Sequence, residues 1–194
     1  MNNQNLMTAI VVDTNDPENL GRILIKLPAL PDGPEIWARA VSPLAGPDRG
    51  LCLLPEIEDE VLVAFAQGEL SSAYVLGGLW NKQKAPPEGL GGEQNDLKIF
   101  RTRAGHTLTF SDKDGEEKIT LTDKNENTIE IAADEDRISL TAKSKIEIKT
   151  DGDIRLEGNT ITLQAGTVEV KADSSLSLDG GGTAELKAGT VNIN

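Results

Sequence analysis

The sequence predicts an all-β protein in two parts: a small N-terminal barrel or sandwich, then an intertwined trimeric β-helix shaped as a triangular prism. Three observations support this prediction. Strand-length apolar runs fill residues 1–81, the composition changes near residue 82, and apolar pairs at i and i+2 repeat through residues 98–194. Period-2 alternation indicates strands, and internal repetition at a short spacing is typical of fibrous or solenoid structures.

The first 81 residues carry apolar runs that are broken by proline and glycine. The runs are "GRILIKLP", "IWARAVSPL", "EVLVAFAQG" and "AYVLGGLWN". Runs of this length rich in Val, Ile and Leu are typical of strands, and roughly four to six short strands suit a small barrel or sandwich. Long helices are excluded by prolines at 28, 31, 34, 43 and 47. We assign residues 1–81 to one domain.

Residues 82–97, "KQKAPPEGLGGEQNDL", have the composition of a linker, with prolines, glycines and polar residues. Their simplest interpretation is a plain connector. From residue 98 onward the repeat takes over, and we assign residues 98–194 to the β-helix.

The repeat places two apolar residues around one polar residue, so that both apolar side chains lie on one face of a strand. The middle residues, such as Glu147, Arg155 and Thr162, are polar. The spacing between pairs shortens from about ten residues to seven or eight along the chain. The predicted trimer core consists of Ile119, Leu121, Ile129, Ile131, Ile138, Leu140, Ile146, Ile148, Ile154, Leu156, Ile161, Leu163, Val168, Val170, Leu176, Leu178, Leu186, Val191 and Ile193.

A single chain has too few strands to bury these pairs by itself. A one-chain β-helix needs about three strands per coil, so the repeats would give barely three coils with open ends. Three chains wound about a common axis solve the problem, because each strand then pairs with strands of neighbouring chains and the apolar pairs fill one interior. The pattern therefore predicts a homotrimer.

Composition and charge exclude several classes of protein. The net charge is -13, and residues 1–97 alone hold 14 acidic against 6 basic side chains. Nucleic-acid binding needs basic residues that neutralise phosphates, so no nucleic acid is expected as a partner. The start "MNNQNLMTAI" has neither basic residues nor a long apolar run, which predicts no signal peptide and assembly in the cytoplasm.

No catalytic, cofactor or metal site is expected. His106 in "RAGHTL" lacks a partner motif and is interpreted as a turn residue, and the lone Cys52 as a buried, inert thiol. "DKDGEEK" lacks the spacing of a calcium loop, so we expect a β-turn at Asp114–Gly115. "DGGGT", residues 179–183, precedes no helix and is expected to form a tight corner or bulge.

Several motifs in order resemble a known family. "DPENLGRILIKLP", "IWARAVSPLAGPDRGLCLLPEIEDEVLVAF" and "GGLWN" resemble the N-terminal OB-fold barrel of phage baseplate assembly protein V and of type VI secretion VgrG proteins. Residues 101–129, "RTRAGHTLTFSDKDGEEKITLTDKNENTI", resemble the segment where those proteins begin their β-helix. One departure is "EDEV", with Glu58 where the family has glycine.

The resemblance implies a structural, non-enzymatic central spike of a contractile injection machine such as a phage tail, tailocin, extracellular injection system or type VI apparatus. Such a spike docks on a baseplate hub protein, contacts and pierces the target envelope on contraction, and travels in a phage tail-like particle. The His-x-His iron tip of some spikes is absent, and a PAAR-type tip protein is expected at the C-terminal end. The alternatives are a trimeric fibre or adhesin that binds a surface receptor and, much less favoured, a β-helical polysaccharide-cleaving enzyme.

We predict that replacing both Ile154 and Ile161 by Asp blocks assembly of the prism, because two inward apolar layers would then hold buried charges. Sedimentation of the purified variant and thermal denaturation check this. A trimer of unchanged stability would contradict the assignment of these residues to the core.

Overall fold

The computed structural model describes residues 6–90 and 93–192. By its packing the chain divides into two units, Met1–Lys145 and Ile146–Asn194. This division lies later than the linker 82–97 that the sequence suggested, because the first unit contains both a barrel and a separate sheet.

The first unit contains all the strands and short helices of the described residues. They are β1 (Leu6–Asp13), β2 (Arg22–Lys26), β3 (Glu35–Ala40), β4 (Ala45–Gly46), β5 (Arg49–Gly50), β6 (Glu60–Phe65), η1 (Ala66–Gly68), η2 (Leu70–Ser72), β7 (Ala73–Gly78), β8 (Leu97–Arg101), β9 (Thr107–Ser111), β10 (Lys118–Thr122), β11 (Thr128–Ala132) and β12 (Arg137–Thr141).

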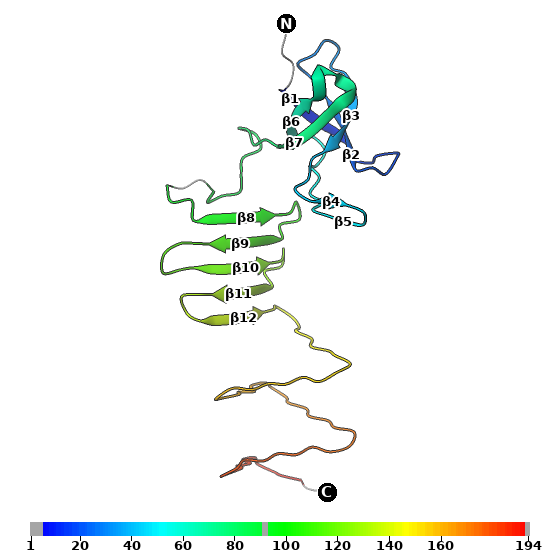
Figure 1. Ribbon diagram of the computed structural model, residues 1–194. Coiled ribbons are helices and arrows are strands. Elements are labelled where there is room, and N and C mark those ends of the chain that lie inside the picture. Colours follow the sequence, from blue (N-terminus) through cyan, green and yellow to red (C-terminus); the bar gives the residue numbers. More distant parts are fainter. Residues whose placement is uncertain (1–5, 91–92, 193–194) are drawn as a thin grey trace. The chain divides into compact units, whose positions relative to one another are not determined.

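The N-terminal strands close into a five-stranded barrel in the order β1-β2-β3-β7-β6 (Figure 1). Only β3 and β7 pair in parallel; the other neighbours, including the closing pair β1 and β6, are antiparallel. A five-stranded barrel of this kind is consistent with the OB fold. The predicted N-terminal barrel is thus confirmed.

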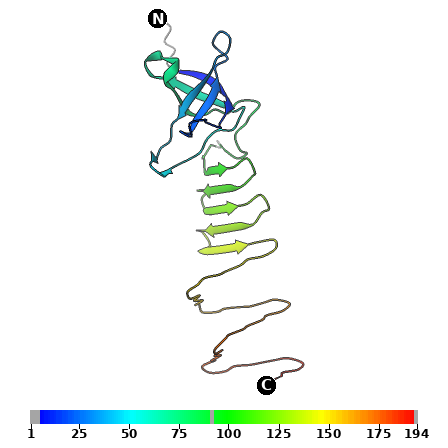
Figure 2. The same cartoon turned by 90° about the vertical axis from the view of Figure 1, so that its right-hand side faces the viewer.

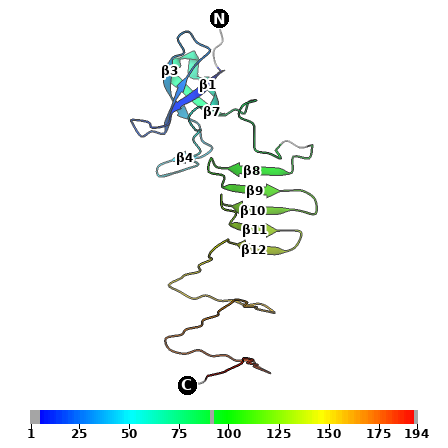
Figure 3. The same ribbon diagram turned by 180° about the vertical axis from the view of Figure 1, so that it is seen from behind.

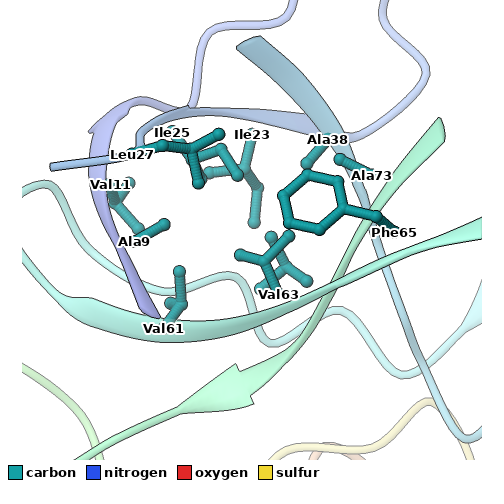
Figure 4. Packing of buried hydrophobic residues seen from close by; sticks show 11 residues of the cluster. Ala9, Val11, Ile23, Ile25, Leu27, Ala38, Val61, Val63, Phe65 and Ala73 are labelled. Carbon is teal, nitrogen blue, oxygen red and sulfur yellow. The ribbon is translucent and has the colours of Figure 1, made fainter. Parts of the chain in front are cut away.

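The barrel core follows from strict alternation along its strands. On β2, Ile23 and Ile25 are fully buried while Lys26 is exposed, and β6 alternates in the same way. Figure 4 shows the side chains of one cluster meeting inside the barrel. The buried cluster consists of Ala9, Val11, Ile23, Ile25, Leu27, Ala38, Val61, Val63, Phe65, Ala73 and Val75. This core belongs to one chain, so the barrel can fold without a partner's side chains.

A buried ion pair organises the loop between β1 and β2. The Asp16 carboxylate accepts backbone N–H bonds from Glu18 (3.1 Å), Leu20 (2.9 Å) and Arg22 (3.1 Å). The Arg22 guanidinium donates to the same carboxylate at 2.7 Å and lies over the Trp37 ring, 5.7 Å from its centroid. The guanidinium, together with the backbone donors, holds the pKa of Asp16 well below its usual range. The carboxylate thereby accepts three backbone N–H groups at the end of this loop.

Glu58 has a backbone conformation that normally favours glycine. Its φ is 71°, in the left-handed region, and its N–H donates to the Val11 carbonyl at 2.8 Å. The motif that this stretch resembles has glycine at this position, which is the residue type that this φ favours.

Residues 97–141 form a five-stranded antiparallel sheet in which each strand pairs with its sequence neighbours, in the order β12-β11-β10-β9-β8. The hairpin loops that join consecutive strands can be followed in Figure 3. The sequence analysis expected pairing between chains throughout the repeat. In this part it is wrong, because loops of four to six residues reverse the chain after each strand and bring consecutive strands together.

The register of this sheet places the apolar pairs of β9 to β12 on one face with Phe100 and Lys98 of β8, whereas Leu97 and Ile99 lie on the opposite face. Residues that lie directly opposite on antiparallel strands share a face, as do residues at i and i+2. One row across the sheet consists of Phe100, Leu108, Leu121, Ile129 and Leu140, and the other of Phe110, Ile119, Ile131 and Ile138. Polar residues such as Thr109, Thr120 and Glu130 form a row on the opposite face.

In the second unit, residues 146–192 contain no assigned strand. Bends or turns recur at residues 151, 158, 166, 173, 181 and 189, a step of seven or eight residues. Figures 1 and 2 show extended segments in this unit that change direction at each bend. The apolar pairs of the sequence lie between these bends, so the repeat is reproduced as extended segments and corners.

We predict that Glu58→Gly raises the stability of the barrel. The left-handed conformation costs an L-residue roughly 1–2 kcal/mol, and the greater freedom of glycine in the unfolded chain cancels part of the gain. A net increase of up to about 1 kcal/mol is expected in thermal denaturation. Glu58→Val should do the opposite, because a β-branched residue fits this φ poorly. Equal stability of the two variants would contradict the argument.

A second prediction concerns acid stability. Because the pKa of Asp16 is lowered in the folded barrel, its contribution is complete above the ordinary Asp pKa of about 3.9 and is lost as the pH falls below that value. Asp16→Asn should lower the Tm at neutral pH and flatten the fall of Tm below pH ~4. Asp32→Asn, at an exposed position, serves as the control. An unchanged acid profile for Asp16→Asn would show that the ion pair does not stabilise the barrel.

Candidate assembly site

The apolar face of the β8–β12 sheet is uncovered in the single chain. Its side chains, apart from the half-buried Leu108, are between 39% and 71% exposed, and Ile138 is the most exposed. The residues of the opposite face include the buried Ser111 and Ala132. An isolated water-soluble sheet would show the reverse pattern. The face is therefore an exposed apolar surface, and all the predicted core residues from Ile119 to Leu140 lie on it.

The predicted core residues from Ile146 to Val191 are also exposed, by 45% to 83%. The first members of the pairs at 146, 154, 161 and 168 are each 55% exposed, which shows that the same local geometry recurs. The last predicted core residue, Ile193, lies outside the described residues.

Ion pairs mark the other face of these extended segments. Glu147 pairs with Lys149 (2.9 Å), and Glu169 with Lys171 (2.7 Å). The partners are two residues apart, so they share a face only when the backbone is extended. Exposed pairs of this kind contribute little free energy. The ion pairs do show which face of each extended segment is polar. The apolar residues that alternate with them lie on the opposite face.

The barrel carries a second exposed apolar group, residues 41–57, which we call the apolar arm. It includes β4 and β5, and its base is ordered by the Ser42 hydroxyl, which lies 2.8 Å from the carbonyl oxygens of Leu44 and Leu51. Its six large apolar side chains are 38–57% exposed: Val41, Leu44, Leu51, Leu53, Leu54 and Ile57. The sequence analysis assigned these leucines no role. Their clustering between Pro43 and Pro55 was the available signal.

Cys52 lies on the apolar arm and is exposed. The expectation of a buried core thiol is therefore wrong. Its apolar neighbours, Leu51 and Leu53, are exposed as well, because this stretch leaves the barrel between β3 and β6.

His106 occupies the turn between β8 and β9, as expected. Its carbonyl oxygen accepts from the Thr102 N–H (2.9 Å), and its Nδ1 accepts from the Lys124 N–H (3.3 Å). The first contact lies within the β8–β9 turn and the second joins that turn to the β10–β11 loop, and neither brings a carboxylate or a nucleophile to the imidazole.

The two glycine motifs also form turns. The Glu116 N–H donates to the Lys113 carbonyl (2.8 Å), which closes a β-turn around Asp114 and Gly115 and confirms that prediction. In "DGGGT", the Gly181 N–H donates to the Asp179 carboxylate (2.8 Å) at a φ of 61°. A Cβ at Gly180 would lie 2.3 Å from the Thr183 carbonyl oxygen, so this corner is closed to larger residues.

Within residues 6–90 and 93–192, no group of three or more His, Cys, Asp or Glu side chains could hold a metal ion. No helix among the described residues is long and apolar enough to cross a membrane. The surfaces that stand out are the uncovered apolar faces and the apolar arm.

Comparison with known proteins bears on the barrel. Residues 7–80 match a family model described as the type VI secretion system/phage-baseplate injector OB domain. The matched segment covers β1 to β7, the whole barrel. A comparison with curated protein sequences found no match. The N-terminal barrel is similar to the injector OB domains of phage baseplates and type VI secretion systems, which confirms the resemblance to baseplate spike proteins.

Proposed function

We propose that this protein is the structural, non-enzymatic central spike of a contractile injection machine. The matched family places an injector OB domain at its N-terminal end. In this proposal the barrel end docks on a baseplate hub protein, and the apolar arm offers its exposed leucines to that contact. The C-terminal end faces the target envelope and pierces it when the sheath contracts.

The observation that carries the proposal is the uncovered apolar surface that follows the barrel. It comprises one face of the β8–β12 sheet and, in the second unit, the apolar pairs from Ile146 to Val191, whose middle residues are polar. Burial of such a surface favours association by roughly 25 cal/mol for each Å² that is removed from water. Three copies arranged about one axis would cover it on every side and form a trimeric β-helix with a continuous dry interior.

Stiffness is the property that such a prism supplies. Its load would be carried by hydrogen bonds between strands and by close-packed aliphatic side chains, and neither requires a catalytic group. The net charge of -13 and the alternating ion pairs keep the outer surface solvated and disfavour nucleic acid. We propose assembly in the cytoplasm, transport within a phage tail-like particle, and a small tip protein over the C-terminal end.

A receptor-binding fibre would share the trimer but would need a recognition surface. Sugar-binding sites commonly use exposed aromatic rings. The sequence has no Phe, Trp or Tyr after Phe110. This favours the spike over the fibre.

We predict that the purified chain has the mass of three copies by sedimentation equilibrium or native mass spectrometry. Leu121→Asp combined with Ile129→Asp should abolish the trimer, since it places charges directly opposite each other on the apolar face. Thr109→Asp, on the polar face of the neighbouring strand and opposite the uncharged Thr120 and Ile99, is the control and should leave the trimer intact.

The same variants test the role in the machine. In particles purified from the host of this protein, the Leu121→Asp and Ile129→Asp variant should lose delivery into target cells, while Thr109→Asp retains it. A wild-type chain that is monomeric at micromolar concentration, or particles that deliver equally well with the double variant, would overturn the proposal.

A further inference from the structure

We propose that a groove on the outer face of the barrel binds an extended segment of a partner protein in which one carboxylate side chain, Asp or Glu, stands between apolar residues. We call it the arginine groove. It is a hollow of about 500 Å³, and its lining includes Leu20, Arg22, Trp37, Arg39, Ser72 and Tyr74. It shares no residue with the apolar arm, and the proposal does not depend on the proposed spike or its trimer.

Alternation along the strands turns the groove residues toward the outside of the barrel. On β3, Ala38 is fully buried, so its neighbours Trp37 and Arg39 point outward. On β7, Tyr74 lies between two buried residues and also points outward. Figure 4 shows Ala38 and Ala73 among the side chains that meet inside the barrel. The same alternation that builds the core therefore builds the groove on its outer side.

The register of the strands brings two arginines together in the groove. Arg22 lies directly opposite Arg39 on the neighbouring strand, and Arg39 lies opposite Tyr74. Each guanidinium lies over an aromatic ring, 5.7 Å from its centroid: Arg22 over Trp37 and Arg39 over Tyr74. Such stacking restricts the planar guanidinium to few orientations, which prepares its N–H groups for a planar acceptor such as a carboxylate.

The first of these arginines already holds a carboxylate. Its Nη2 donates to Asp16 Oδ1 at 2.7 Å and its Nε to Asp16 Oδ2 at 3.2 Å, and Arg22 also pairs with Glu18 at 2.9 Å. This two-point contact is the geometry that guanidinium groups prefer for carboxylates. Arg39 has the same stacking on a ring, but none of the ion pairs among residues 6–90 and 93–192 includes it. The carboxylate of the partner completes this second unit.

The position of Arg39 is unfavourable for the barrel by itself, because like charges directly opposite each other on neighbouring strands repel. Residues 1–81 contain four cations, Arg22, Lys26, Arg39 and Arg49, and two of them meet in the groove. The one tyrosine of the sequence and one of its two tryptophans lie there as well. Arg, Trp and Tyr are the residue types that contribute most at protein interfaces. Their concentration here favours recognition over barrel stability as the role of Arg39.

The surroundings of Arg39 favour a peptide over a nucleic acid or a sugar. The 14 acidic against 6 basic side chains of residues 1–97 repel a chain of phosphates, whereas a fixed guanidinium can still hold a single carboxylate. Sugars stack on ring faces, and a guanidinium covers one face of each ring in the groove. The exposed Leu20 and the half-buried Trp37 offer an apolar wall to the residues that flank the carboxylate.

Binding of synthetic hexapeptides to the purified full chain tests the proposal. The panel consists of acetylated and amidated peptides with one Asp or Glu between Leu, Val and Phe residues, and each has a twin with Asn or Gln instead. Binding is followed by the fluorescence of Trp37 in a Trp80→Phe background, because Trp80 is exposed and lies outside the groove. We expect at least one acidic peptide to bind at least about tenfold more tightly than its amide twin.

Variants assign the binding to the groove. Arg39→Gln should weaken binding of the acidic peptide by at least about tenfold and remove its advantage over the amide twin. Arg39→Lys, which keeps the charge but loses the planar fork, should retain only part of the affinity. Lys26→Gln is the matched control, since it removes the same charge from an exposed position outside the groove, and it should bind like wild type. Because Arg39 is exposed, the Tm of its variants should stay near that of wild type.

Several results would overturn the proposal. They are a panel without a binding peptide, acidic peptides that bind no better than their twins, and equal losses in Arg39→Gln and Lys26→Gln. Tighter binding of oligothymidylate or of a chitin hexasaccharide would assign the groove to another class of ligand. A second copy of the chain as occupant would leave the peptides unbound and make the oligomer mass depend on Arg39. None of these outcomes bears on the proposed spike, which the mass and delivery measurements test separately.

Discussion

Apolar side chains that alternate with polar ones must be covered on one side, and in this protein the second half of the chain provides no cover of its own. The barrel meets the requirement by closing on itself around Ile23, Ile25 and Val63. The sheet that follows has only one layer, and residues 146–192 do not even form a layer. Every other feature of the second half, from its polar outer face to its regular corners, is compatible with cover from identical chains.

The two halves therefore depend on assembly to different degrees. The barrel has a complete core within one chain, so it can be the stable end that docks to other components. The sheet has a complete set of strand ladders but an uncovered face. Residues 146–192 have no strand ladder and their apolar pairs are exposed, so in the proposed trimer their order would depend on other chains most strongly. This gradient along the chain is what a rod anchored at one end would require.

Much of this organisation could be predicted from the sequence. The alternating runs predicted the barrel strands, and the apolar pairs predicted the shared face that the register of β8 to β12 confirms. The in-chain hairpins were not predicted, although a turn was expected at Asp114–Gly115, because every strand of the repeat was expected to pair with strands of neighbouring chains. Cys52 was misplaced, since its apolar neighbours resemble a core strand and only the fold shows that the arm leaves the barrel. The role of Asp16 could not be predicted, because it depends on contacts with three later residues and no short sequence motif indicates it.

The polar residues in the middle of each pair have a consequence during synthesis. A nascent chain leaves the ribosome with its barrel able to fold at once, while in the proposed trimer the stretch after residue 145 would wait for two sister chains. During that interval its alternating aliphatic residues would resemble an aggregation-prone segment. Glu147, Glu169 and Glu185, each ion-paired with a lysine, would then discourage pairing with unrelated strands.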